Sequence, residues 1–404
     1  MAKKIFGHFS FSKEINNMGR KFICPKCGNE DIRKIGYLNG EPYCRACIRF
    51  TGPLANIEPS KTISFINNKR GEYSLSYQLS NDQFRISNMI LNCYLSGVEA
   101  LIYAVCGAGK TEIVYETISY VLRNGGKVGF AIPRRDVVIE IYQRLKEVFK
   151  HDKLTSVYGG HTEHLDGDLI CLTTHQLFRF QKYFDLLIVD EIDAFPYSGD
   201  EVLEAFVKTS YTKGLVMMSA TPSKKVKSYF SKEGRTILYL NTRFHEHPLP
   251  VPIVVKKSIG VRELYIIKKL KSFINENKPV FIFVPTISIG ENLNLIISKV
   301  VPNGRLVHSK CKDREEIISN FKSGRYKYLI TTAVLERGVT VKNLQVIIFM
   351  ADHEIYDEHA LVQISGRVGR KKDAPEGEVI FIVRHESQAI RKCIREIKAA
   401  NSHL

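Results

Sequence analysis

The sequence predicts an α/β protein with two parallel-sheet lobes in tandem behind a small four-cysteine module. The chain has 404 residues, more than one hydrophobic core usually fills. Short apolar runs alternate with amphipathic stretches, which is the pattern of a parallel sheet covered by helices on both faces. The alternation restarts after Pro248-Leu-Pro-Val-Pro252, and two Cys-x₂-Cys pairs stand near the start of the chain.

The apolar runs give the expected strands. Those of the first lobe are Ala100–Val105, Lys127–Ile132, Leu169–Thr173, Leu186–Asp190 and Leu215–Ser219. Those of the second lobe are Val280–Val284, Tyr328–Thr332, Val346–Met350 and Val379–Val383. Helical periodicity is expected at Ile113–Leu122 and near residues 262–276, 289–300, 312–322 and 386–400. Ile63–Phe65 and Tyr73–Tyr77 are further candidates for short strands.

These patterns divide the chain into five parts. We expect a loose arm at residues 1–20, the cysteine module at 21–52 and the first lobe at 53–245. Residues 246–252 are the expected linker, because alternating proline resists both helix and sheet. The second lobe then takes residues 253–404.

The charge balance favours a polyanionic partner. A formal net charge of +17 suits nucleic acid or an anionic membrane face, although it is also compatible with solubility alone. No stretch is long and apolar enough to cross a bilayer, and the start of the chain lacks an apolar signal core. We therefore expect a cytoplasmic protein.

A phosphate-binding loop is predicted at Ala104–Thr111, between an apolar strand and a helix. Gly107 and Gly109 allow backbone N–H groups to turn towards phosphate oxygens, and the helix N-terminus adds its dipole. Lys110 is expected to reach the β- and γ-phosphates and Thr111 to bind Mg²⁺. The residues expected to bind ATP here are Gly107, Ala108, Gly109, Lys110, Thr111 and Glu112.

A second motif, Asp190-Glu191-Ile192-Asp193, follows an apolar strand at the edge where a parallel sheet places its ligand. Asp190 is expected to hold Mg²⁺ through water, and Glu191 to polarise the attacking water. Asp193 is expected to relay contacts between the lobes. Acids at a strand end can also be simple helix caps, but the phosphate loop favours the catalytic interpretation.

Cys24, Cys27, Cys44 and Cys47 form two Cys-x₂-Cys pairs separated by 16 residues. This spacing is typical of a tetrahedral structural zinc site in which all four ligands come from the protein. Disulfide pairing is the alternative, which a cytosolic setting disfavours. Lysine, arginine and aromatic residues surround the pairs and would suit nucleic acid, or simply form a solvated basic face.

With these motifs and several more in order, residues 78–385 resemble the superfamily 2 helicases and translocases. The resemblance implies two RecA-like lobes, an adenine contact from Gln83, and coupling of hydrolysis to strand movement through Ser219, Thr221 and Gln363. It also implies nucleotide contacts from Gly338, Arg367 and Arg370. The two arginines would reach the γ-phosphate from the second lobe as arginine fingers, so that hydrolysis requires closure of the cleft.

The same resemblance implies a nucleic-acid track. Backbone N–H, hydroxyl and guanidinium groups at its predicted positions suit phosphates, although each position could also be an ordinary strand-to-helix turn. These positions are Pro133, Arg134, Arg135, Gly160, Thr174, His175, Thr286 and Thr332.

The N-terminal cysteine module and the motif sequences together resemble the ComFA family of competence proteins. That family implies an ATPase that moves single-stranded DNA inward during natural transformation, with a ComFC-like protein, DprA and the ComEC channel as partners. It also implies a peripheral position at the inner face of the membrane. Two alternatives stay open: a duplex-separating helicase like the replication-restart protein PriA, and a zinc-dependent DNA-binding adaptor with an ATP switch. The Asp-Glu-Ile-Asp motif departs from the Asp-Glu-Ala-Asp of RNA helicases, which favours DNA.

Overall fold

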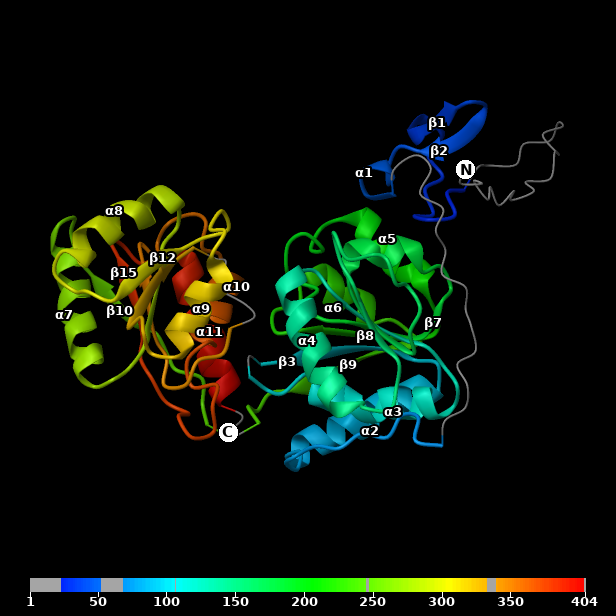
Figure 1. Cartoon of the computed structure of the whole chain (residues 1–404), viewed down its shortest axis with the longest axis horizontal. Coiled ribbons are helices and arrows are strands. Elements are labelled where there is room, and N and C mark those ends of the chain that lie inside the picture. Colours follow the sequence, from blue (N-terminus) through cyan, green and yellow to red (C-terminus); the bar gives the residue numbers. More distant parts are fainter. Residues whose placement is uncertain (1–22, 52–67, 106, 245–246, 333–338, 403–404) are drawn as a thin grey trace, which may run out of the picture.

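The computed structural model of the chain describes residues 23–51, 68–105, 107–244, 247–332 and 339–402. Two parallel sheets, each covered by helices, form two RecA-like lobes in tandem, and the cysteine module lies beside the first of them (Figure 1). The predicted fold class is therefore confirmed. Within the described ranges, no helix is long and apolar enough to cross a membrane.

The first lobe contains a seven-stranded parallel sheet in the order β5-β6-β4-β7-β8-β3-β9. Its strands are β3 (Glu99–Ala104), β4 (Val128–Ile132), β5 (Leu154–Val157), β6 (Leu169–Thr173), β7 (Phe184–Val189), β8 (Tyr211–Ser219) and β9 (Arg235–Leu240). Its helices are α2 (Asn81–Leu95), η2 (Glu112–Val114), α3 (Tyr115–Arg123), α4 (Arg135–Val148), η3 (Thr174–Arg179), α5 (Glu201–Ser210) and α6 (Lys224–Phe230).

The second lobe contains a six-stranded parallel sheet in the order β10-β15-β14-β11-β13-β12. Its strands are β10 (Ile253–Lys256), β11 (Val280–Phe283), β12 (Gly304–Val307), β13 (Tyr328–Thr331), β14 (Gln345–Phe349) and β15 (Val379–Val383). Its helices are α7 (Val261–Asn275), α8 (Ile287–Ser298), α9 (Arg314–Lys322), α10 (Glu358–Ser365) and α11 (Gln388–Asn401).

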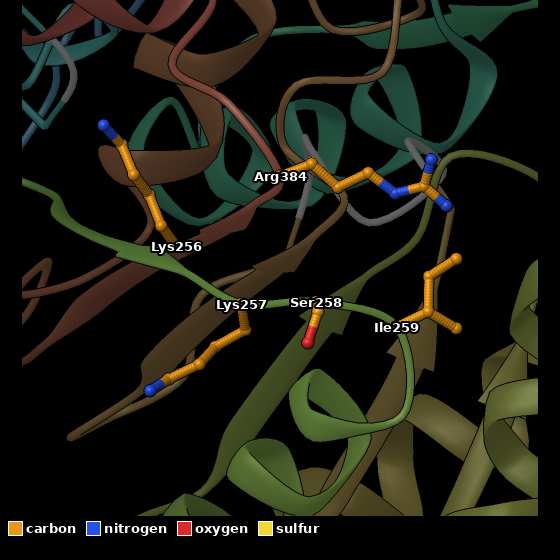
Figure 2. Close-up of a pocket in the computed structure, with 5 residues that line it drawn as sticks. All are labelled: Lys256, Lys257, Ser258, Ile259 and Arg384. Atoms are coloured by element: carbon orange, nitrogen blue, oxygen red, sulfur yellow. The ribbon is translucent and has the colours of Figure 1, made fainter.

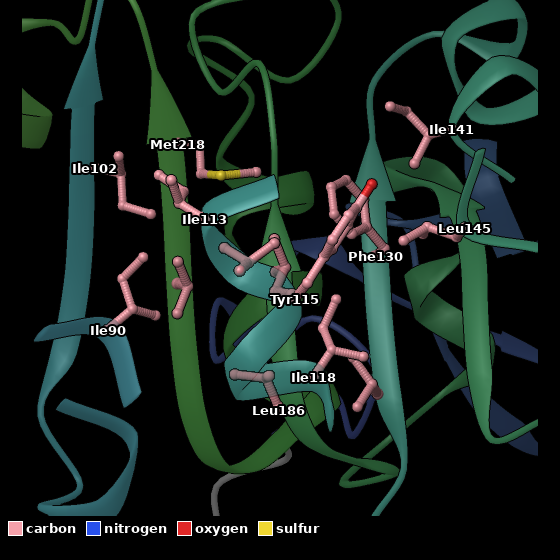
Figure 3. Close-up of a cluster of buried hydrophobic side chains, with 14 of the residues drawn as sticks. Ile90, Ile102, Ile113, Tyr115, Ile118, Phe130, Ile141, Leu145, Leu186 and Met218 are labelled. Carbon is pink, nitrogen blue, oxygen red and sulfur yellow. The ribbon is translucent and has the colours of Figure 1, made fainter. Parts of the chain in front are cut away.

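The core of the first lobe fixes the helix that follows the phosphate loop. Figure 3 shows Ile113 and Ile118 packed among strand residues such as Ile102 and Met218, and all four are buried. Burying such side chains contributes roughly 1.5–3 kcal/mol each. The start of α3 is therefore held firmly against the sheet.

Every strand predicted from an apolar run is present, with ends that differ by a few residues. The sequence did not predict β5, β9, β10 and β12, and these four are the edge strands of the two sheets. The prediction of a strand at Tyr73–Tyr77 is wrong, because this segment is irregular chain. There the Tyr73 ring packs 5.7 Å from the Phe149 ring and its hydroxyl donates to Glu116. The other candidate strand, Ile63–Phe65, lies outside the described residues.

The proline-spaced segment is tied to the last helix of the chain. The Leu249 N–H donates to Asn401 Oδ1 at 2.8 Å, and Asn401 Nδ2 donates back to the Leu249 carbonyl at 2.9 Å. The side-chain amide of α11 thus satisfies the backbone of a segment in which proline prevents sheet pairing. The first strand of the second lobe begins directly afterwards, at Ile253.

Candidate functional site

The phosphate loop follows β3 and requires glycine at two positions. Gly107 and Gly109 have φ values of +83° and +75°, which side-chain-bearing residues rarely adopt. A Cβ at Gly109 would also lie 2.2 Å from Gln83 Nε2. Close approach of a neighbouring side chain and a left-handed backbone therefore both select glycine, as the sequence motif predicted.

Gln83, the predicted adenine-reading residue, is bonded to the phosphate loop. Its Nε2 donates to the Ala108 carbonyl at 2.9 Å, and its Oε1 accepts from the Ser80 N–H at 3.0 Å in a capping box at the start of α2. Each end of the amide makes one hydrogen bond, which leaves a second N–H and a second lone pair that an adenine contact could use. Gln83 thus links the start of α2 to the loop.

Lys110 and Thr111 lie opposite the acids that end β7. Lys110 Nζ is 3.8 Å from Asp190 Oδ1, and Thr111 is buried directly before η2. The Thr111 hydroxyl and the Asp190 carboxylate are hard oxygen ligands of the kind that Mg²⁺ prefers. Thr111 and Asp190 therefore fit the metal of a magnesium–nucleotide site. Glu112 is engaged elsewhere, because its carboxylate accepts from Tyr77 at 3.1 Å and pairs with Arg144.

Asp190 and Glu191 have unusual environments. Burial raises the pKa of Asp190, and the nearby Lys110 ammonium opposes that shift. Asp190 Oδ1 accepts from the Glu191 N–H at 2.7 Å. Glu191 has a φ of +56°, a left-handed conformation that costs a non-glycine residue about 1–3 kcal/mol and is concentrated at functional sites.

The four residues predicted to couple the lobes meet at Asp193. Its carboxylate accepts from Ser219 Oγ at 2.7 Å and from Thr221 Oγ1 at 3.0 Å, at the end of β8 and two residues beyond it. Gln363 Nε2, on α10 of the second lobe, lies 3.5 Å from the same carboxylate. One acid, three residues beyond Asp190, therefore connects the end of β8 with the opposite lobe.

The two predicted arginine fingers follow α10 in a turn, not in the helix. Arg367 is buried, and its Nη1 donates to the Val339 carbonyl at 3.0 Å. Arg370 is half-buried, and its Nε donates to the Gly366 carbonyl at 2.8 Å. Gly338, the remaining predicted nucleotide residue of this lobe, lies outside the described residues.

Arg243 is a further candidate residue that the sequence did not indicate. It follows β9 and is only 1% exposed. Its Nη2 donates to the Val368 carbonyl at 2.7 Å, between the two predicted fingers, while a Cβ at Gly107 would lie 3.2 Å from its Nε. One guanidinium therefore lies beside the phosphate loop of the first lobe and donates a hydrogen bond to the arginine segment of the second. An isolated arginine before a linker carries no sequence signal for this position.

We expect Arg243→Ala to lower kcat for ATP hydrolysis roughly tenfold or more, about 1.4 kcal/mol of transition-state stabilisation. The reason is that Val368 loses the contact holding Arg367 and Arg370 beside the phosphate loop. ATP affinity should change less, because the phosphate loop keeps its other groups. Steady-state kinetics and nucleotide binding measure the two effects, and thermal melting checks the fold. Arg235→Ala is the control, since Arg235 starts β9 and pairs with Glu99 away from the cleft. An unchanged kcat in Arg243→Ala would contradict this role.

The residues predicted to contact the nucleic-acid strand lie at the carboxyl ends of the two sheets. Pro133, Arg134 and Arg135 follow β4, Gly160 follows β5, Thr174 and His175 follow β6, Thr286 follows β11 and Thr332 follows β13. Arg135, Gly160 and Thr286 are exposed, whereas Thr174 is completely buried and so is out of reach of a nucleic-acid strand in this arrangement. Thr286 Oγ1 caps α8 by accepting from the Ile289 N–H.

A basic cavity of about 610 Å³ lies at the same edge of the second lobe, where β10 and β15 end. Figure 2 shows its three cations, Lys256, Lys257 and Arg384. Lys256 and Lys257 point to opposite sides of the chain, and Arg384 extends away from both (Figure 2). The cavity therefore adds positive charge to this edge without a converging anion site.

The four cysteines of the module gather around one point. Cys24 Sγ lies 3.8 Å from Cys47 Sγ, and Cys27 Sγ lies 3.6 Å from Cys44 Sγ. All four are buried, and their sulfur atoms lie within 4.8 Å of one another. Disulfide sulfurs would be about 2.0 Å apart, whereas Zn–S bonds of about 2.3 Å in a tetrahedron place sulfurs about 3.8 Å apart. The donor set therefore fits a zinc ion.

The module is docked on the first lobe. Its β1 (Ile35–Leu38) and β2 (Glu41–Cys44) form a hairpin, followed by α1 (Ile48–Thr51). The Phe50 ring packs 5.3 Å from the His175 ring and 5.8 Å from the Phe206 ring, while Arg49 pairs with Asp200. Burial there lowers the pKa of His175. The module thus lies beside His175, which is predicted to contact the nucleic-acid strand.

We expect the double variant Cys24→Ser, Cys27→Ser to lose bound zinc and the order of residues 23–51. Metal binding supplies about 10–16 kcal/mol of folding energy in small zinc modules, and so short a segment has little core of its own. Metal analysis of the purified chain and hydrogen exchange of the module test this. Cys93→Ser is the control, because Cys93 lies on α2 outside the cysteine group. Native protein without zinc would refute the assignment.

Comparisons with known proteins agree with this arrangement. Residues 84–229 match the DEAD/DEAH box helicase family, and residues 265–372 match the helicase conserved C-terminal domain. Competence protein ComFA of Bacillus subtilis is 34% identical over 98% of this chain and 89% of that protein. ComFA of Streptococcus pneumoniae is 34% identical over 94% and 90% respectively. Yeast Dbp5 bound to RNA and ADP BeF3 is 17% identical, with a TM-score of 0.61 over 81% of this chain and 92% of Dbp5.

Two RecA-like lobes, the first of which carries a phosphate loop and an acidic motif, and the two matched helicase domains define an ATP-dependent, helicase-type enzyme of superfamily 2. The relatives that match almost the whole chain narrow this class. The chain belongs to the ComFA family of competence proteins and is a helicase-like motor of that system.

Proposed function

We propose that this protein uses ATP hydrolysis to move along single-stranded DNA and so drives DNA import during natural transformation. The observation that carries the proposal is the Asp193 contact set. Asp193 stands three residues from Asp190, bonds Ser219 and Thr221, and reaches Gln363 of the other lobe. A change at the nucleotide can therefore be transmitted to the position of the second lobe.

In this mechanism ATP would lie against the phosphate loop, with Lys110 at the β- and γ-phosphates, and Thr111 and Asp190 would hold Mg²⁺. Glu191 orients the attacking water, and Arg367 and Arg370 stabilise the charge that develops at the γ-phosphate. Because these arginines belong to the second lobe, hydrolysis occurs only in the closed arrangement. Loss of the γ-phosphate then weakens closure and lets the second lobe move relative to the strand.

The strand is held at the carboxyl ends of both sheets. Contacts there come from backbone N–H groups, hydroxyls and guanidinium groups, which bind phosphates without reading sequence. The net charge of +17 supports a polyanionic partner. The relatives are named as competence proteins, which supports DNA import as the biological role. A ComFC-like protein, DprA and the ComEC channel are the proposed partners, at the inner face of the membrane.

Displacement of streptavidin from biotinylated single-stranded DNA tests the proposal. We expect ATP-dependent displacement, none with a non-hydrolysable analogue, and little separation of a blunt duplex. Efficient separation of duplexes would favour the PriA-like alternative. ATP hydrolysis with no displacement from single strands would favour the adaptor with an ATP switch.

A further inference from the structure

Two aromatic rings are stacked at the carboxyl end of β5. The Tyr158 and His161 ring centroids are 4.9 Å apart with an interplanar angle of 19°. The residues flank Gly159 and Gly160 and exchange two backbone hydrogen bonds, of 3.2 and 2.8 Å, around the turn. Gly160 has a φ of +80°, which the tight turn requires. The backbone therefore fixes the rings in register before any ligand arrives.

A cation completes the stack. The Arg135 Cζ atom, at the start of α4, lies 4.9 Å from the centre of the Tyr158 ring. Tyr158 is half-buried between these neighbours, whereas His161 is exposed. The stack thus has a packed inner ring and an imidazole as its outer ring. We refer to Arg135, Tyr158 and His161 as the ring platform.

The surroundings of His161 suit an uncharged nucleobase better than a phosphate group. The imidazole lines a hollow of about 470 Å³ together with Tyr142, His164, Glu163 and Asp166. Asp166 is paired with Lys153 at 2.7 Å, and Glu163 is exposed. Lys153 also lines the hollow, but the two carboxylates outnumber it, so the hollow offers a phosphate no excess of positive charge.

The ring platform lies where the two lobes meet. Asp136, the residue after Arg135, forms an ion pair with Arg314 at the start of α9 in the second lobe. Helices α4 and α9 accordingly face each other across the gap between the lobes in Figure 1. Lys310 and Lys312, in the loop before α9, are exposed. A DNA strand that contacts both lobes at the carboxyl ends of their sheets would pass these two lysines and the ring platform.

We propose that the ring platform stacks against one base of the bound single strand, with His161 as the contacting ring. This inference rests on the proposed function and adds a base contact to a track otherwise made of phosphate contacts. Stacking tolerates any sequence, because every base has a flat face. It holds the strand on the first lobe while the second lobe shifts, and so reduces slippage between steps.

Strands with and without bases test the platform directly. The full chain is titrated at fixed salt with labelled oligothymidine and with an abasic strand of equal length, which carries the same phosphates. We expect wild type to prefer oligothymidine on the order of tenfold, and His161→Ala to lose most of that preference while keeping its affinity for the abasic strand. His161→Phe restores a flat ring and should restore the preference.

His151→Ala is the matched control, because His151 is an exposed histidine beyond the far end of α4. It should keep the wild-type preference. A full preference for oligothymidine in His161→Ala would overturn the ring platform and leave the proposed function intact. Failure of wild type to bind either strand would instead contradict the proposed function, and the platform with it.

Discussion

Lys110→Ala is expected to reduce ATP turnover on the order of 100- to 1,000-fold, because the phosphates lose the one ammonium placed within the loop. Lys110 Nζ is also the cation 3.8 Å from Asp190 Oδ1, so the acid expected to hold Mg²⁺ loses its counter-charge as well. Binding of single-stranded DNA should stay within about threefold of wild type, since phosphate contacts on the track are separate groups. A coupled ATPase assay and DNA anisotropy measure the two quantities.

Lys213→Ala serves as the control for Lys110→Ala. Lys213 lies on β8, is exposed, and stands 4.5 Å over the Tyr94 ring away from the phosphate loop. It should hydrolyse ATP at the wild-type rate. Turnover in Lys110→Ala equal to that of Lys213→Ala would remove the nucleotide-site assignment.

Arg370→Ala is expected to lower kcat by about 1,000-fold while leaving ATP affinity within severalfold, because an arginine finger acts mainly on the transition state. Its side chain is already oriented by the hydrogen bond from Nε to the Gly366 carbonyl. Arg370→Lys should not rescue the rate, since an ammonium lacks the planar fork of donors.

Single-turnover hydrolysis and binding of a fluorescent ATP analogue separate the two effects of Arg370→Ala. Arg305→Ala is the matched control, an exposed arginine on the edge strand β12 of the same lobe. A normal single-turnover rate in Arg370→Ala would exclude Arg370 as a finger.

The interior of both sheets was predictable from the sequence, and the edges were not. Strands such as β4, β6 and β15 are buried along their whole length, so they appear as continuous apolar runs. The edge strand β10 has no buried residue, and β9 has buried residues only at Leu238 and Leu240. Polar and apolar residues are mixed in β9, and β10 is only four residues long, so neither strand gives a clear periodic signal.

The residues of the candidate site likewise divide into those that local motifs predict and those that only the fold brings to the site. Lys110, Asp190 and Asp193 stand in local motifs whose chemistry depends on a strand end and a loop, and their positions follow from the sequence. Arg243 enters the site only because the fold brings the end of β9 between Gly107 and Val368. The engagement of Gln83 with Ala108 is likewise a tertiary contact that no spacing in the sequence records.

The most direct test of the two-lobe motor is the steady-state rate of ATP hydrolysis by the full chain with Mg²⁺, measured with and without saturating single-stranded DNA. We expect single strands to accelerate hydrolysis about tenfold or more, because a strand held by both lobes favours the closed arrangement that brings Arg367 and Arg370 to the phosphates. Duplex DNA and RNA should accelerate it less. A rate that does not change when single-stranded DNA is added would contradict the coupling of the nucleotide site to the strand.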